Sequence, residues 1–297
     1  MRHLLSYSLM LLVLLSATQA SGYVRTKTCD PDGEDVRRLC KKGYVPVEIW
    51  WPKRCVTIFL NRQGGGDFEQ EEKNLPSFEL REAVGAAMVP WNDVSCSDVT
   101  LTYGGLTCNR QVVKRQDNVR NGFMNTVLWQ EEEWTGGTGV VALARVSFDA
   151  KDGRISDVDI EMNGVDNTFG ILQSADESNP KYDVENTLVH EFGHLLGLAH
   201  ETQEEDATMW ASADNGELKK RDLHPDDEAG LCAIYPSDDS TPACFPAVLE
   251  DTTCVVEFSG QAGCAHTPGA PDAPPAWWLA LGAIGWIGRR RRLLKAQ

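Results

Sequence analysis

Apolar and polar positions alternate with the period of a strand in several parts of this 297-residue chain. Residues 55–60 form a β-branched and aromatic run that ends at Asn61 and a glycine-rich loop, which is typical of a strand. Further strands are predicted at 99–103, 126–129, 140–148 and 155–162. Residues 149–153 are rich in turn formers and are expected to join the last two strands as a hairpin.

Two segments have the 3.6-residue period of a helix. The first begins at 76–77, is expected to end at Pro90, and carries one apolar face made of Leu80, Val84, Ala87 and Trp91. The second is predicted to start near Tyr182. A strand, a helix, several strands and a second helix in this order predict an α+β domain, in which helices pack on a mixed α/β sheet.

The predicted strand 155–162 alternates strictly between acidic and apolar residues. Asp157, Asp159 and Glu161 fall on one face of it. Carboxylates at this spacing could bind Ca²⁺. An exposed acidic face on an edge strand, which deters aggregation, explains the same pattern. Since the strand pattern alone accounts for these residues, we favour the exposed edge strand and keep calcium as the alternative.

Residues 190–200, HEFGHLLGLAH, carry the most specific chemical pattern of the chain. In a helix, His190 and His194 lie one turn apart on the same face, where two neutral imidazoles can hold one zinc ion. Glu191 can reach a water on that metal without being a ligand. Gly197 lets the chain leave the helix and bring back His200 as a third ligand. Three protein ligands with an open fourth position are typical of catalytic zinc.

A surface helix that carries histidines by chance is the alternative interpretation. The chain has six histidines, and three of them fall in these eleven positions together with Glu191 and a well-placed glycine. We therefore interpret the segment as a metal site.

The pattern H-E-x-x-H-x-x-G-x-x-H resembles the zinc signature of the metzincin metalloproteases, in which a methionine turn lies beneath the metal. Met209 matches that methionine, and its short distance from His200 is similar to the matrixin branch, the matrix-metalloprotease type. Residues 223–236, LHPDDEAGLCAIYP, resemble the last matrixin helix. Two positions depart from the pattern. Glu201 follows the third histidine, as in astacins, and no tyrosine stands two residues after Met209, so a tyrosine that helps to bind the transition state is not carried over.

The resemblance covers about residues 54–236. It implies a twisted, mostly parallel sheet with an antiparallel edge strand, an active-site helix and a C-terminal helix. In the family, the edge strand, here matched to 155–162, borders the active-site cleft and pairs with the substrate backbone. The loop 210–223 would form the wall of the pocket beside the metal, with Trp210 either there or in the core.

The resemblance implies a secreted zinc endopeptidase. One catalytic zinc would be held by His190, His194 and His200, and Glu191 would be the general base. The alternative is a catalytically silent, zinc-bearing surface protein that binds a partner. The intact Glu191 argues against it, because a binding protein does not need that carboxylate.

The termini carry the features of targeting segments. A charged start, an apolar run at 9–15 and small residues up to Ala20 are typical of a secretory signal. We divide the chain into this signal (1–20), a cysteine-containing segment (21–53), the catalytic domain (54–236), a linker (237–275) and a C-terminal segment (276–297). That last segment, with Cys264 before it and arginines at 289–292, resembles the MYXO-CTERM tails of bacterial surface proteins; a simple membrane anchor is the alternative. The expected location is the cell surface or the exterior of a bacterium, with membrane contact only through this tail. Residues 21–53 contain no P-R-C-G-type motif, so latency by the matrixin route is not predicted.

Nine cysteines in an exported chain predict disulfides rather than metal ligands. Proximity in the sequence suggests the pairs 29–40, 96–108 and 244–254, which leaves 55 to pair with 232 and Cys264 unpaired. Proximity is a weak guide, because connectivity depends on the fold.

The formal net charge of -16 limits the classes of binding partner that the protein could have. Such a charge argues against nucleic acid and anionic lipid. Solubility explains it most simply, although bound calcium or basic substrates would also fit. We expect a protein or peptide substrate and a monomer.

Overall fold

A computed structural model describes residues 22–29, 40–68, 76–108, 124–176 and 178–237, together with 244, 255–256 and 262–263. The chain divides into two compact units, Met1–Glu250 and Asp251–Gln297. In the second, the described part is a hairpin of β8 (Val255–Val256) and β9 (Ala262–Gly263). The expected signal and C-terminal segments lie outside the described residues. None of the helices that are described is long and apolar enough to cross a membrane.

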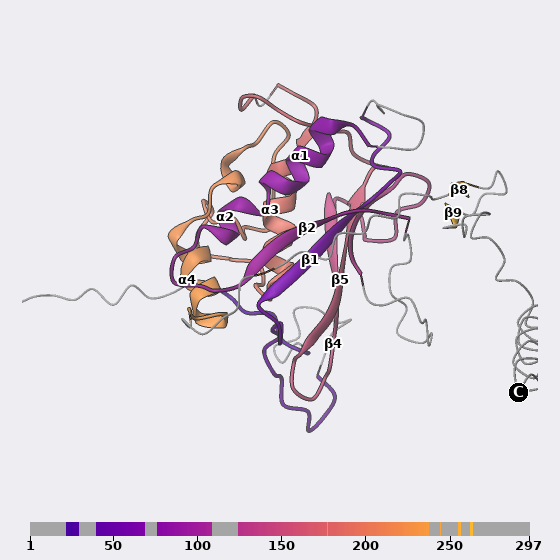
Figure 1. Ribbon diagram of the computed structural model, residues 1–297. Helices are drawn as coiled ribbons and strands as arrows, with labels where there is room; N and C mark the ends of the chain where they lie inside the picture. The colour runs from indigo at the N-terminus through magenta and orange to yellow at the C-terminus, as the bar shows by residue number, and fades with distance from the viewer. Residues whose placement is uncertain are drawn as a thin grey trace, which may run out of the picture. The chain divides into compact units, whose positions relative to one another are not determined.

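The first unit is built on a five-stranded sheet (Figure 1). Its strands are β1 (Cys55–Asn61), β2 (Thr100–Thr107), β3 (Asn125–Gln130), β4 (Ala142–Phe148) and β5 (Ile155–Asn163). They lie in the order β2-β1-β3-β5-β4, with β4 antiparallel and all other neighbours parallel. The α+β class and the mostly parallel sheet with an antiparallel edge strand are confirmed. The expectation that 155–162 is the edge strand is wrong, because β4 folds back beyond β5 and takes the edge.

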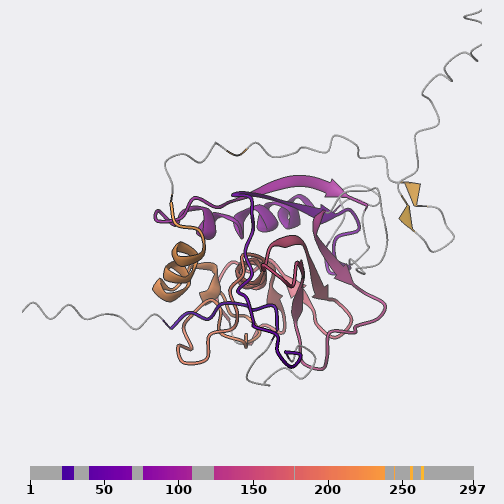
Figure 2. The same ribbon diagram turned by 90° about the horizontal axis from the view of Figure 1, so that it is seen from below.

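Helices α1 (Phe78–Ala86) and α3 (Val184–Leu195) lie side by side on one face of this sheet, as Figures 1 and 2 show from two directions. Val158, Ile160 and Met162 of β5 point into the shared core. The first helix does not run on to Trp91 as a single element. It ends at Ala86, and α2 (Val89–Asn92) begins beyond it with Pro90 in its first turn, where the missing N–H has no helical partner to lose. Pro90 therefore starts a helix, whereas the sequence suggested that it ends one.

The remaining elements surround α3. Two short parallel strands, β6 (Phe169–Gly170) and β7 (Tyr182–Asp183), precede it. A 3₁₀ turn, η1 (Lys219–Arg221), and helix α4 (Pro225–Ile234) follow it. Among these, η1 packs directly on α3.

The acidic face of β5 is buried, which corrects the expectation of an exposed face. Asp157, Asp159 and Glu161 are each less than 5% exposed, because β3 and β4 flank β5 on both sides. Both carboxylate oxygens of Glu161 are occupied, by Arg145 and by the amide of Gln130. Asp159 accepts a hydrogen bond from the Thr126 N–H. The three carboxylates are not brought together as a metal-binding group among the described residues.

Asp157 differs from its neighbours, because neither of its carboxylate oxygens has a hydrogen-bond partner. Burial raises its pKa from 3.8 to about 6. As the pH rises through this range, the unfolded chain releases the proton first, so folding loses stability between about pH 4 and 6. We expect Asp157→Asn to raise the free energy of unfolding at pH 7.5 by about 1 to 2 kcal/mol, and to have no such effect at pH 4. Urea unfolding of both proteins at the two pH values measures this. A variant that is less stable at pH 7.5 would contradict the expectation and would favour a cation bound at Asp157.

The N-terminal segment is packed against the end of α3. Val24 accepts a hydrogen bond from the Ala199 N–H at 2.7 Å, and the Thr26 N–H donates to the Gly197 carbonyl at 2.9 Å. The Trp51 indole N–H donates to the Leu195 carbonyl at 2.8 Å. Gly197 has a φ of 101°, and a Cβ there would lie 2.8 Å from the Ile49 carbonyl oxygen. The turn that leads to His200 is therefore supported by residues 24–26 and 49–51.

The disulfides differ from most of the expected pairs. Cys29–Cys40 is present as expected. Two further disulfides among the described residues are Cys55–Cys244 and Cys96–Cys232, so the suggested pairs 96–108, 244–254 and 55–232 are wrong. Sequence separations of 189 and 136 residues show the reason: the fold, and not chain proximity, brings these cysteines together. Cys108 is also disulfide-bonded, and Cys254 and Cys264 lie outside the described residues.

Candidate active site

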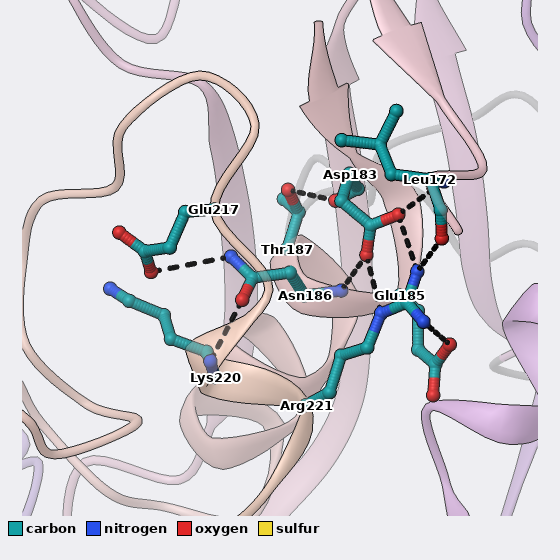
Figure 3. Close-up of polar contacts among 8 residues, drawn as sticks. All are labelled: Leu172, Asp183, Glu185, Asn186, Thr187, Glu217, Lys220 and Arg221. Atoms are coloured by element: carbon teal, nitrogen blue, oxygen red, sulfur yellow. Dashed lines mark hydrogen bonds and ion pairs between the residues drawn. The ribbon is translucent and has the colours of Figure 1, made fainter. Parts of the chain in front are cut away.

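A polar network fixes the start of helix α3 (Figure 3). The Asp183 carboxylate caps the helix by accepting the Asn186 N–H at 2.8 Å. The Arg221 guanidinium binds both oxygens of the same carboxylate, at 2.7 and 2.9 Å, and donates to the Leu172 carbonyl at 2.8 Å. A two-point bond of this kind fixes orientation as well as distance. It joins the start of helix α3 to η1, which lies 38 residues further along the chain.

Helix α3 and the turn after it bring three histidines together. The possible ligand atoms of His190, His194 and His200 all lie within 4.8 Å of one another. The Nε2 atoms of His194 and His200 are 3.1 Å apart. Among the described residues, this is the group of histidine, cysteine or acidic side chains that could hold a metal ion. His190 is almost buried, and His200 is the most exposed of the three, with part of its ring covered by the site.

Backbone carbonyls orient two of these rings. The Nδ1 atom of His190 lies 2.7 Å from the Thr208 carbonyl, and that of His194 lies 2.9 Å from the Leu198 carbonyl. Since a carbonyl can only accept, both Nδ1 atoms carry the proton, and Nε2 of each ring is left as a metal ligand. Burial lowers the pKa of His190 well below its usual range, and lowers that of His200 too. Neutral imidazoles are the form that binds zinc, so the donor set fits this metal.

Glu191 is placed beside the histidines but is not part of their group. Its side chain is only 5% exposed, and its Oε2 atom has no hydrogen-bond partner. Burial raises the pKa of Glu191 to about 8, while the backbone N–H of Ala144 on β4 and the charge of Lys220 act in the opposite direction. A buried carboxylate with one free oxygen next to a metal-binding group has the properties of a proton acceptor in catalysis.

Met209 packs directly against helix α3. It is 2% exposed, and a Cβ on Gly193 would lie 2.2 Å from its sulfur. Gly193 falls between His190 and His194, so only a residue without a side chain allows this contact. The same chain segment supplies the Thr208 carbonyl that orients His190.

Asp227 holds that segment in place. Its buried carboxylate accepts the N–H groups of Thr208 at 2.7 Å and Met209 at 3.1 Å, as well as that of His224 at 3.1 Å. Asp227 lies in the first turn of α4, where a carboxylate is favoured by the helix dipole. The structure adds a specific role, because the last helix is bonded through Asp227 to the turn below the histidines.

Sequence reasoning missed three residues around the site, namely Asp227 as the support of the methionine turn, and Lys220 and Arg221 on η1. The role of Asp183, the partner of Arg221, could have been predicted from the sequence, because an aspartate just before a helix is a common N-cap. The sequence around Lys220 and Arg221 resembles any charged loop, so it does not predict that these two residues lie at the site. Trp210 is half-buried and its indole donates to Ser212, so it does not belong to the main core.

Comparisons with known proteins agree with this geometry. The family model described as Matrixin, of Peptidase_M10, matches residues 67–236. Metalloendoproteinase 2-MMP of Arabidopsis thaliana is 29% identical over 165 residues, which is 56% of this chain and 39% of the relative. Metalloendoproteinase 4-MMP of the same plant is 30% identical over 118 residues, which is 40% of this chain and 31% of the relative. The chain thus spans less than half the length of these relatives. Since the family model covers more than half of the chain, this protein belongs to the matrixin family.

Proposed function

We propose that this protein is a zinc-dependent endopeptidase. The observation that carries the proposal is the pairing of three convergent imidazoles with the unpartnered Oε2 atom of the buried Glu191. His190, His194 and His200 would hold the metal through Nε2. When bound, zinc would acidify water and polarise a peptide carbonyl. The matrixin membership and the metalloendoproteinase names of the relatives support the same reaction class.

Glu191 would be the general base of the reaction. Its Oε2 atom would take the proton of the attacking water and return it to the leaving amine. Burial away from bulk water makes this carboxylate more basic, as its raised pKa indicates, and the charge of a bound metal nearby would favour its ionised, proton-accepting form. Met209 would serve as the methionine of the turn below the metal.

The substrate backbone would add to the outer edge of β4. This strand is the edge of the sheet on the side of Glu191, since its Ala144 N–H bonds to that carboxylate. An extended peptide can pair with such an edge, which places its backbone next to the catalytic carboxylate. We therefore assign to β4 the substrate-pairing role that the sequence suggested for 155–162.

We further propose that the protein works outside the cell. Disulfides form in oxidising compartments, and the structure contains several. Residues 1–20 would direct export, and 276–297 would retain the protein at a bacterial surface. Protein or peptide substrates and a monomeric state belong to this proposal, while calcium binding has no support from the arrangement of Asp157, Asp159 and Glu161.

Removal of the metal tests the proposed activity. The full chain should cleave a denatured protein, lose at least 90% of that activity in 1,10-phenanthroline, and regain it when zinc is added back. The same preparation should contain one zinc per chain by metal analysis. A protein that binds zinc but cleaves no substrate would overturn the proposal in favour of a zinc-bearing binding protein.

A further inference from the structure

A small cavity lies where the segment after β1, the start of α1 and the β6–β7 pair meet. Its volume is about 230 Å³, and its lining comes from the segments 67–68, 77–79 and 169–171 and from Lys181. None of the lining residues belongs to the histidine site. The proposed peptidase mechanism therefore gives this cavity no function.

One side of the cavity is apolar and tightly packed. Phe68 and Phe169 both line it, and the Trp129 ring packs edge-on against each of them, with ring centroids 5.9 and 6.0 Å apart. Phe169 is fully buried, and Ile171 adds a third apolar side chain to the lining. Because packed aromatic rings resist displacement, this apolar surface exists before any ligand arrives.

A hydrogen bond and close packing hold the walls of the cavity together. The Asp67 Oδ2 atom accepts the N–H of Phe169 at 2.7 Å, which joins two segments that are 102 residues apart. On another wall, a Cβ on Gly170 would lie 2.9 Å from the Lys181 Cδ atom, so the stem of Lys181 packs directly over this glycine. The cavity is therefore a preformed feature of the fold.

The charged groups that line the cavity are not matched by partners within the described part of the protein. Asp67 uses Oδ2 for the bond to Phe169, and its Oδ1 atom has no partner among the described residues. The Glu79 carboxylate and the Lys181 ammonium likewise form no hydrogen bond or ion pair with a described residue. Two negative groups and one positive group thus line the cavity beside its apolar surface, and each is available to a ligand.

The size and the charges of the cavity define the class of ligand. Sites for drug-sized molecules measure about 300 to 1,000 Å³, so a cavity of about 230 Å³ fits a smaller molecule. A simple ion would leave the apolar surface uncovered. A ligand with a charge of one sign would be matched on one side of the cavity and would meet a like charge on the other. A small zwitterion with an apolar body satisfies all of these conditions.

We propose that this cavity binds a free α-amino acid with an apolar side chain, such as leucine. The ammonium of the ligand would bind the carboxylates of Asp67 and Glu79, and its carboxylate would bind the ammonium of Lys181. Its side chain would lie on the rings of Phe68 and Phe169. The proposal does not depend on the peptidase function, because its ligand touches neither the histidines nor their metal.

Calorimetric titration of the full chain with L-leucine tests the proposal. The protein carries Glu191→Gln, so that it does not digest itself during the measurement. We expect a Kd of about 1 mM or below. Leucinamide lacks the carboxylate, N-acetyl-leucine lacks the ammonium, and glycine lacks the side chain. Each of these should bind at least about tenfold more weakly than leucine, because each loses one of the three contacts.

Substitutions locate the binding site. Lys181→Met should weaken the binding of leucine by about 10- to 100-fold, since it removes the partner of the ligand carboxylate. Lys219→Met, which removes an exposed lysine on η1, should leave the Kd unchanged. The pair of variants also separates the cavity from the metal, because an amino acid that bound to zinc would be insensitive to Lys181→Met.

Three results would contradict the proposal. Absence of leucine binding at about 10 mM would show that the cavity takes no amino acid. If leucinamide, N-acetyl-leucine or glycine bound as tightly as leucine, the three-point recognition would be wrong. If leucine bound to the Lys181→Met protein as it does to the protein with Lys181, the ligand would lie elsewhere. The comparison of the four ligands needs no variant at the cavity, so it decides the matter even if Lys181→Met does not fold.

Discussion

Glu191→Gln is expected to lower kcat/KM for peptide hydrolysis by about 10²- to 10⁴-fold. The amide has nearly the shape of the carboxylate but cannot accept a proton at neutral pH. Since Glu191 is not part of the histidine group, the variant should retain its zinc. Steady-state cleavage of a quenched fluorescent peptide, with metal analysis of the same sample, measures both effects.

The control for this variant is Glu79→Gln. Glu79 is an exposed glutamate in the first turn of α1, away from the histidines, so this change should leave activity within twofold of wild type. A Glu191→Gln protein with wild-type kcat/KM would show that another group moves the proton. Loss of zinc from the same variant would show that Glu191 supports the metal, in which case its role as general base would need a different test.

The second large effect is expected from Asp227→Ala. The change leaves the buried N–H groups of Thr208 and Met209 without their acceptor, together with that of His224. The expected loss in the free energy of unfolding is about 3 to 5 kcal/mol, because each unsatisfied buried donor is costly. Zinc affinity should fall as well, since the Thr208 carbonyl that orients His190 belongs to the same turn. Urea unfolding and competition with a zinc chelator measure the two losses.

Asp226→Ala provides the matched comparison for this variant. Asp226 precedes Asp227 in the same helical turn, but it is half-buried and accepts from Gly22 of the N-terminal segment. Its replacement should cost about 1 kcal/mol and leave zinc affinity unchanged. Equal effects of the two variants would indicate that the helix dipole, which both aspartates share, is the main contribution. The specific support of the methionine turn would then be contradicted.

The parts of the site that sequence analysis predicted are the parts that depend on local spacing. His190 and His194 are one helical turn apart whatever surrounds them, and Gly197 provides the φ of 101° that brings the chain round to His200. The β-strands followed from alternation in the same way. Each of these features is set within about ten residues, where the geometry of helix, strand and turn is nearly fixed.

The features that sequence analysis missed depend on contacts between distant segments. The prediction that Asp157 and Asp159 lie on an exposed edge strand was wrong. Alternation shows that a strand has two different faces, but it does not show which neighbouring elements cover them. The order of β5 and β4 in the sheet decided this. Likewise, Lys220 is held near the site by bonds to residues far away in the sequence: its own N–H bonds to Asn186, and its neighbour Arg221 bonds to Asp183, 38 residues earlier. Contacts of this kind, and the disulfide pairs as well, can be predicted only when the topology of the fold is known.

The most direct test of this account is a zinc K-edge absorption measurement on the full-length Glu191→Gln protein, which should keep its metal without digesting itself. The account predicts one zinc per chain with three imidazole nitrogens at about 2.0 to 2.1 Å and one oxygen in the remaining position. A sulfur ligand at about 2.3 Å, or a shell of four protein ligands, would mark a closed structural site. Either finding would contradict the assignment of His190, His194 and His200 to a catalytic zinc.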